Sequence, residues 1–292
     1  MKHIVIIGIV IIGIGLLIVI KSMPDTNNEI DKISYQDIDA LDIVQEEISN
    51  NELIDEFSQD GILSETGSMS ESESTWWWVN SGAYFVVEGG IGRTIRGGLS
   101  EGDVWRKKYN DAKPKTTQDG FHPQNIFRLI TKQKWQNMSE EVYFKITGMH
   151  KAPVEERGES NGVLLFGHYI DQDDLYYAGL RVDGQAVIKK KIKGKYETLA
   201  IEQIYEGEYD REHNENLLPR DKWIGLRMTV QDYDGDVIIA LFIDKNKTGK
   251  WEQVLTTVDA GNNQALIRKG HAGIRTDFMD VEFENYIIKE IL

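Results

Sequence analysis

The stretch 175–192, LYYAGLRVDGQAVIKKKI, places two runs of β-branched and aromatic residues on either side of the pair Asp183-Gly184. Successive side chains of a β-strand point to opposite faces, so short segments with a period of two predict strands. Asp-Gly is a preferred pair in two-residue hairpin turns. The stretch therefore predicts an antiparallel β-hairpin.

Segments of the same kind recur along the chain and are separated by clusters of Gly, Asn and Asp. They are NIFRLITK (125–132), EEVYFKITG (140–148), GVLLFGHYI (162–170), WIGLRMTV (223–230), DVIIALFID (236–244), HAGIRTD (271–277) and DVEFENYII (280–288). The three consecutive tryptophans at 76–78 precede them and predict the first strand of the domain, with Trp76 and Trp78 on one face and Trp77 on the other. Many short strands without helical periodicity predict an all-β protein, a two-sheet antiparallel sandwich or a barrel.

The amino-terminal segment is apolar and differs from the rest of the chain. Ile4–Ile20 contains no charged residue and lies between Lys2 and Lys21. As a helix it would span about 25 Å, near the lower limit for crossing a bilayer. The segment ends in VIKSMP, a poor cleavage site for a secretory signal. Residues 1–21 therefore predict an uncleaved transmembrane anchor, a cleaved signal being the alternative, with the C-terminal domain extracellular or periplasmic.

Residues 22–75 carry 15 acidic residues and one lysine, whereas the whole chain has a net charge of −15. High charge with few aromatics predicts a disordered acidic stalk. The domain proper is then expected at 76–292 and is close to neutral. Neither part offers the concentrated Lys and Arg that bind phosphates, which argues against a nucleic-acid partner. The absence of cysteine excludes disulfides and thiolate chemistry.

Four late segments carry a resemblance to a known family. Their order is YYAGLRVDGQAVIKKKIKGKY, WIGLRMTV, IALFIDKNKTGKW and GHAGIRTDFMDVEFENYII. In pattern and order, residues 76–292 resemble the concanavalin A-like lectin and glucanase superfamily. The resemblance implies a jelly roll of two curved antiparallel sheets, the concave one commonly forming a glycan groove. Because the superfamily contains lectins, glycosidases, lyases and adhesive modules, it specifies fold better than activity.

Strand alternation defines a candidate groove. If the polar faces of four strands belong to one sheet, they bring together His168, Tyr177, Arg181, Arg227 and Arg275. Arginine binds carboxylates through a planar fork of donors, which suits an acidic polysaccharide. The alternative is an ordinary solvated sheet face with cross-strand ion pairs. The predicted partner is a polysaccharide or glycoconjugate.

Two catalytic alternatives stay open beside simple binding. In a polysaccharide lyase acting on uronates, His168 would be the base, Tyr177 the acid, and Arg181 or Arg227 would neutralise the carboxylate. Jelly-roll alginate lyases use a similar set, but their sequence motifs are absent here. In a glycoside hydrolase, Asp280, Glu282 and Glu284 would supply carboxylates along one strand face; the resemblance instead implies a solvated outer face for that strand. An adhesive surface module without glycan is the third class.

Calcium is a possible cofactor of three acidic segments. Asp171, Asp173 and Asp174 form one, Asp232, Asp234 and Asp236 form another, and DKNKTG (244–249) resembles the start of a calcium loop. Leu255 occupies the twelfth position, where an EF-hand has an acid. Asp and Asn are also the usual turn residues, and turns are the favoured interpretation of all three segments.

Overall fold

The computed structural model describes residues 9–11, 16–18, 51–260 and 265–291. The chain forms two compact units, Met1–Ile48 and Ser49–Leu292. In the first unit, β1 (Ile9–Ile11) pairs with β2 (Leu16–Ile18) in an antiparallel ladder. These six residues are strands where a helix is predicted, in keeping with the strand preference of Ile and Val. The rest of the predicted anchor lies outside the described residues. Within the described ranges, no helix has the length and apolar content to span a bilayer.

The second unit begins well before the predicted boundary at residue 76. Composition places residues 51–75 in the stalk, yet they contain β3 (Glu52–Asp55), β4 (Gly61–Ser64) and the short 3-10 helix η1 (Met69–Glu71). Leu53 and Phe57 are buried at 3% and 2% exposure and join the hydrophobic core. The burial of these two apolar side chains thus fixes the segment to the folded unit in spite of its acidic composition. Residues 22–50 of the predicted stalk lie outside the described residues.

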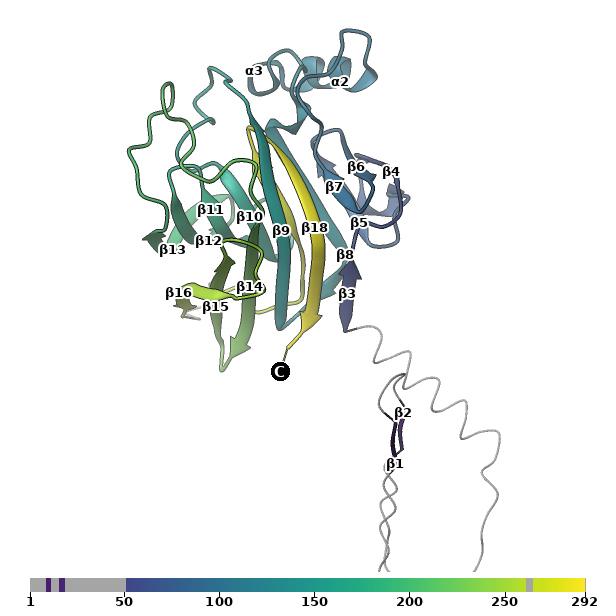
Figure 1. The fold of residues 1–292 in the computed structure, drawn as a ribbon, viewed down its shortest axis with the longest axis vertical. Helices are drawn as coiled ribbons and strands as arrows, with labels where there is room; N and C mark the ends of the chain where they lie inside the picture. Colours follow the sequence, from purple (N-terminus) through teal and green to yellow (C-terminus); the bar gives the residue numbers. More distant parts are fainter. Residues whose placement is uncertain (1–8, 12–15, 19–50, 261–264, 292) are drawn as a thin grey trace, which may run out of the picture. The chain divides into compact units, whose positions relative to one another are not determined.

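Two antiparallel sheets form the second unit (Figure 1). The seven-stranded sheet has the order β13 (Lys195–Gln203), β12 (Gln185–Ile192), β11 (Leu175–Arg181), β10 (Gly162–Tyr169), β17 (Gly270–Asp277), β8 (Ile126–Trp135) and β5 (Trp77–Ser81). The nine-stranded sheet has the order β16 (Glu252–Asp259), β15 (Asp236–Asp244), β14 (Ile224–Tyr233), β9 (Met138–Met149), β18 (Met279–Glu290), β7 (Ile91–Arg93), β6 (Tyr84–Glu88) and β4, with β3 also pairing β18. The predicted all-β, two-sheet antiparallel sandwich is confirmed. The tryptophan run leads into β5, which follows β3 and β4, so the prediction that it forms the first strand of the domain is wrong.

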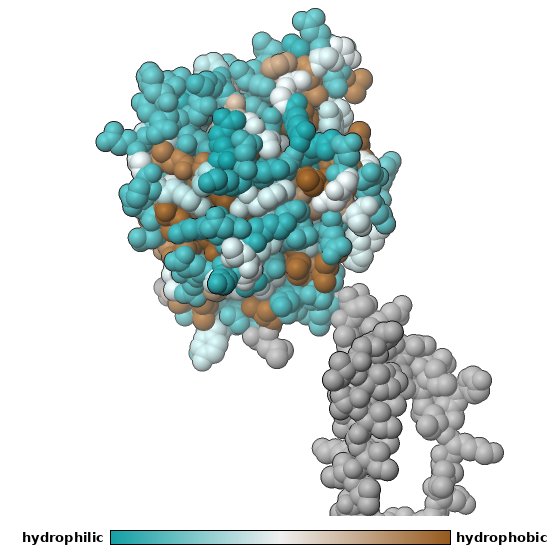
Figure 2. Space-filling view, viewed as in Figure 1, coloured by the Kyte–Doolittle hydropathy of each residue, from teal (hydrophilic) through white to brown (hydrophobic). Residues whose placement is uncertain are grey.

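The core lies between the two sheets and follows the alternation of each strand. The seven-stranded sheet points Leu165, Ala178 and Ile274 inward, and the nine-stranded sheet points Val142, Leu226 and Phe283 toward them. All six are fully buried. Burying one large apolar side chain stabilises the fold by roughly 1.5–3 kcal/mol, so this layer is the main source of stability. The outward residues of each strand remain available for other contacts, and the surface in Figure 2 is mostly hydrophilic.

A helical insert connects β7 to β8 and lies at one end of the sandwich (Figure 1). It contains α2 (Val104–Ala112), α3 (Pro114–Thr117) and the 3-10 helix η2 (Pro123–Asn125). The Asp103 side chain caps α2 by accepting a hydrogen bond from the Trp105 amide at 2.7 Å. Pro114 occupies the first turn of α3, where its missing amide hydrogen costs nothing.

One ionisable side chain points into the core. Glu140 is fully buried on β9, and its Oε1 accepts a hydrogen bond from the Tyr286 hydroxyl at 2.6 Å. Among the described residues, its Oε2 has no hydrogen-bond partner. Burial raises the pKa of Glu140 well above its ordinary value, although hydrogen bonds from Tyr286 and Gly273 oppose the shift. Burial therefore favours the neutral form of this carboxyl group. Its neighbour Glu141 points to the opposite face, where it pairs with Arg227.

Glu140→Gln is expected to stabilise the protein at pH 8. A carboxyl group whose folded pKa is raised contributes full stability below its ordinary pKa and loses it as the pH rises, because the unfolded chain ionises first. Glutamine cannot ionise, so the melting temperature should rise at pH 8, by about 2–4 °C per kcal/mol, and change little at pH 4. Calorimetry at both pH values measures this, with Glu141→Gln as the control that shows no such gain. An equal difference at both pH values would contradict the assignment.

Candidate functional site

The five residues predicted to form a groove lie in three different places. Tyr177, Arg181 and Arg275 share the outer face of the seven-stranded sheet, on β11 and β17. His168 lies inside the sandwich, and Arg227 belongs to the nine-stranded sheet. The prediction of one groove holding all five is therefore wrong, and three of its members remain together.

His168 is displaced by a β-bulge. The register of β10 against β17 shifts between Phe166 and Tyr169, and His168 adopts a left-handed φ of 45°. The bulge turns its fully buried ring inward, away from the face that carries Phe166. Nδ1 and Nε2 each lie 2.6 Å from a backbone carbonyl, those of Leu266 and Gln136. Both ring nitrogens are occupied and shielded from solvent, so the predicted role of His168 as a catalytic base is wrong.

Arg227 lies on the outer face of the other sheet. Its Nε donates to Glu141 Oε2 at 2.5 Å, and its guanidinium stacks over Trp251 with 4.2 Å to the ring centroid. Trp251 fits there because residue 225 is glycine; a Cβ at Gly225 would lie 2.6 Å from the indole. Tyr143 packs beside Trp251 at 5.6 Å between ring centroids. Arg227 is therefore part of an aromatic and ion-paired surface of the nine-stranded sheet.

The other two predicted arginines also have internal partners. Arg275 contacts both carboxylate oxygens of Asp277, at 2.9 and 3.1 Å, and donates to the Tyr177 hydroxyl at 3.0 Å. Arg181 donates to Asp183 at 2.7 Å. Both ion pairs join residues two apart in the sequence, whereas the alternative interpretation of the sequence expected cross-strand pairs. Their guanidinium charges are largely neutralised within the fold.

Other cations share this surface and exceed its carboxylates. We define the basic face as the outward-facing side of the seven-stranded sheet; its cations are Arg128, Lys132, Lys134, Arg181, Lys189, Lys191 and Arg275. Asp173, Asp183 and Asp277 pair with three of them, Lys191, Arg181 and Arg275. Among the described residues, the remaining four cations have no carboxylate partner. The basic face therefore carries an excess of positive charge in a protein whose net charge is −15.

The pKa shifts of Lys189 and Tyr196 reflect this positive field, whereas burial dominates at Tyr177. Burial lowers the pKa of Lys189, and repulsion from Arg181 and Arg275 lowers it further. Burial would raise the pKa of Tyr196, but attraction by Arg275 and Lys191 outweighs it and the pKa falls below 10. Burial raises the pKa of Tyr177 to about 12. The field at Tyr196 stabilises negative charge, which is the property that an anion-binding surface needs.

Aromatic rings lie among these cations. Phe166 and Tyr177 are buried within the face, although both point away from the main core. Tyr196 is 55% exposed and stacks on Tyr177, with 6.1 Å between ring centroids and 26° between ring planes. The Lys191 ammonium lies 4.9 Å from the Tyr196 ring centroid. The basic face thus offers an exposed ring flanked by positive charges.

Sequence reasoning missed Arg128, Lys189 and Tyr196. The signal was present for the first two, because alternation in NIFRLITK and QAVIKKKI places them opposite the core residues of their strands. Tyr196 lies in β13, a strand that was not predicted, since its mixed composition has no clear apolar face.

The carboxylates predicted for a hydrolase share the outer face of β18, as expected, but they are not solvated. Asp280 and Glu282 are 8% and 3% exposed. Asp280 contacts His150 at 2.7 Å, Glu282 contacts Lys145 at 2.6 Å and also Arg96, and Glu284 pairs with Lys247. Hydrogen bonds and ion pairs occupy all three carboxylates, which gives them a structural role.

The acidic segments considered for calcium are turns. Asp244 accepts hydrogen bonds from the Asn246 and Gly249 amides and from the Thr248 and Tyr143 hydroxyls. Asp171 accepts from the Asp173 and Asp174 amides in the same manner. In the part of the chain that the structure describes, no group of three or more His, Cys, Asp or Glu side chains is arranged to hold a metal ion.

Lys191→Gln is expected to raise the pKa of Tyr196. The ammonium of Lys191 stabilises the tyrosinate, so its removal favours the neutral phenol. A pH titration of tyrosine-labelled protein by NMR measures the shift. Lys134→Gln removes a charge from the same face at a position that does not act on Tyr196, and it should leave the titration unchanged. Identical Tyr196 titrations in Lys191→Gln and the wild type would contradict this assignment.

No family model and no curated protein matches the sequence. The structure is similar to the carbohydrate binding module CBM66 from Bacillus subtilis, with 12% identity, a TM-score of 0.44, and coverage of 75% of this chain and 98% of that chain. It is similar to winged bean acidic lectin, with 8% identity, a TM-score of 0.46, and coverage of 81% and 96%. It is also similar to the GH43 protein BlXynB from Bacillus licheniformis, with 13% identity and a TM-score of 0.44 over 82% of this chain; the match spans 39% of that protein's length. These similarities concern the fold alone.

Proposed function

We propose that the second unit is a glycan-binding domain whose basic face binds an acidic polysaccharide. The observation that carries this proposal is the set of four cations without a carboxylate partner among the described residues, Arg128, Lys132, Lys134 and Lys189. They lie on one sheet face: Lys189 is on β12, next to the strand of the half-exposed Tyr196, and the other three are on β8, four strands further across the sheet. Carboxylates on successive sugar units would pair with these cations, and a sugar ring would stack on Tyr196.

Binding is a better proposal than catalysis. A lyase needs a base beside the uronate, and His168 is buried with both ring nitrogens occupied. A hydrolase needs an accessible carboxyl pair, and the candidates on β18 are buried and paired. Neither catalytic alternative keeps its predicted residues in an accessible position.

The basic face also favours a polysaccharide over a nucleic acid. The four cations without a carboxylate partner are spread over two strands, β8 and β12. A nucleic acid presents about one charge per 1.7 Å and would need a denser cationic surface.

Lys189→Glu is expected to weaken binding of a uronate polysaccharide about tenfold, which corresponds to ~1.4 kcal/mol. The variant removes an unpartnered cation and adds repulsion at the centre of the face. Electrophoresis through gels containing polygalacturonate measures the retardation, at several salt concentrations because exposed charge interactions are screened. Lys250→Glu, in the exposed loop between β15 and β16, is the matched control and should bind as the wild type does.

Two results would contradict this proposal. Equal retardation of the Lys189 and Lys250 variants would mean that binding occurs elsewhere on the domain. If neither acidic nor neutral polysaccharides retard the wild type, the glycan proposal fails and an adhesive module that binds protein becomes the better interpretation.

We also propose that residues 1–21 anchor the protein in a membrane with the domain extracellular or periplasmic. The apolar run Ile4–Ile20 supports the proposal by its length and lack of charge. The full chain should stay with the membrane fraction after an alkaline wash, and a chain beginning at residue 22 should be released. Recovery of the full chain in the soluble fraction would contradict the anchor.

A further inference from the structure

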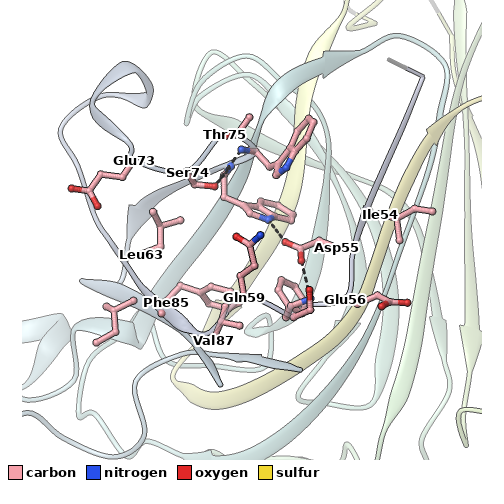
Figure 3. Close-up of a pocket in the computed structure, with 16 residues that line it drawn as sticks. Ile54, Asp55, Glu56, Gln59, Leu63, Glu73, Ser74, Thr75, Phe85 and Val87 are labelled. Carbon is pink, nitrogen blue, oxygen red and sulfur yellow. Dashed lines mark hydrogen bonds between the residues drawn. The ribbon is translucent and has the colours of Figure 1, made fainter. Parts of the chain in front are cut away.

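A pocket of about 690 Å³ lies beside the tryptophan run, and none of the basic-face cations is in its lining (Figure 3). The segment from β3 to β4, the segment that leads into β5, and β6 form its walls. Its polar and aromatic lining includes Asp55, Glu56, Gln59, Glu73, Trp76 and Trp77. Its volume is in the range of pockets that hold small ligands.

Two adjacent tryptophans have different roles in this pocket. Trp77 is 4% exposed, packs edge-on against Tyr286 at 4.6 Å, and donates from Nε1 to Asp55 at 2.7 Å. Trp76 is 47% exposed, yet its backbone is fixed: its carbonyl accepts from the Lys132 amide at 2.7 Å and its amide donates to the Ser74 hydroxyl at 3.2 Å. The buried indole is structural, and a rigid backbone presents the exposed one to solvent.

Neutral polar groups are distributed around the apolar floor. In Figure 3, Gln59 lies between Leu63 and Asp55. Among the described residues, no hydrogen bond occupies the Gln59 amide. Ser58 and Thr75 add hydroxyl groups to the lining. A ligand with several hydroxyl groups and one apolar face matches this combination of amide, hydroxyls and indole.

The charge of the pocket selects among such ligands. Its lining contains three carboxylates, Asp55, Glu56 and Glu73, and no Lys, Arg or His. The segment 51–88 that builds it contains eight acidic residues and no basic one. Among the described residues, none of the three carboxylates forms an ion pair. The pocket repels anions and attracts an ammonium group, which is the reverse of the basic face.

We propose that this pocket binds an amino sugar whose amine is free and therefore cationic at neutral pH. The sugar ring lies against Trp76, its hydroxyls bond to the Gln59 amide and the neighbouring hydroxyls, and its ammonium lies near the carboxylates and the indole. A lysine side chain carries the same charge, but it has no hydroxyls to match the polar lining. This site has its own lining residues, and it meets the basic face at Lys132, whose Nζ donates to the Ser74 carbonyl at 2.9 Å.

The test compares two sugars that differ only at the nitrogen, which is a free ammonium in one and a neutral acetamide in the other. Isothermal titration of the full chain in detergent uses a glucosamine hexamer and an N-acetylglucosamine hexamer. The glucosamine hexamer should bind at least about tenfold more tightly, Trp76→Ala should lose about tenfold of that affinity, and Trp76→Phe should retain most of it. Tyr233→Ala removes an aromatic side chain that is 71% exposed outside the pocket, and it should bind as the wild type does.

Each other outcome overturns a stated part of the proposal. Equal binding of both hexamers excludes recognition of the ammonium. Binding that is unaffected by Trp76→Ala excludes the pocket. Tighter binding of tetralysine than of the glucosamine hexamer identifies a basic peptide as the occupant, and binding of none of the three probes rejects the proposal.

The two sites are separable in one set of variants. Lys189→Glu should leave the glucosamine affinity unchanged, and Trp76→Ala should leave retardation by polygalacturonate unchanged. Failure at one site therefore does not imply failure at the other.

Discussion

The sandwich depends on how the chain passes from one sheet to the other at Phe278. This residue alone separates β17, in the seven-stranded sheet, from β18, in the nine-stranded sheet. It adopts a φ of 55°, which is rare and strained for a bulky residue. Backbone hydrogen bonds to Asn125 and from His150 hold it there, and its side chain is 2% exposed. Through Asn125, the helical insert therefore stabilises the backbone of Phe278, where the chain passes from the seven-stranded to the nine-stranded sheet.

Much of the sandwich could be predicted because strand alternation is a local property. The inward and outward residues of β11, β14 and β17 follow their sequences closely. Two features of the site are not local. The bulge at His168 reverses one side chain without any change in composition, and the sheet that contains Arg227 depends on pairing between distant strands. Residues that face the same way on separate strands therefore form one site only if those strands belong to the same sheet and no bulge reverses a side chain.

Average composition also concealed how charge is arranged in the folded unit. Residues 51–75 resemble a stalk by their acidity, but Leu53 and Phe57 fix them to the core and turn an acidic segment into a pocket wall. In the net charge of the sequence, acidic residues of loops and edges cancel the cations of the seven-stranded sheet. Folding separates the two kinds of charge into a basic face and an acidic pocket. The near-neutral total for residues 76–292 therefore conceals the basic face, and the pocket carboxylates come from residues 51–75.

The three consecutive tryptophans, Trp76, Trp77 and Trp78, occupy three different environments. Trp76 is exposed at the pocket, Trp77 is in the core, and Trp78 packs at the edge of the basic face, where its Nε1 donates to the Thr66 carbonyl at 3.2 Å. Because the three side chains are chemically identical, a slip of β5 by one residue would still place an indole in two of the three environments. The hydrogen bonds of the Trp76 backbone oppose that slip. The run therefore tolerates substitution at its exposed end far better than insertion or deletion within it, since a change of phase would turn Val79, which is fully buried in the core, to the opposite face of β5.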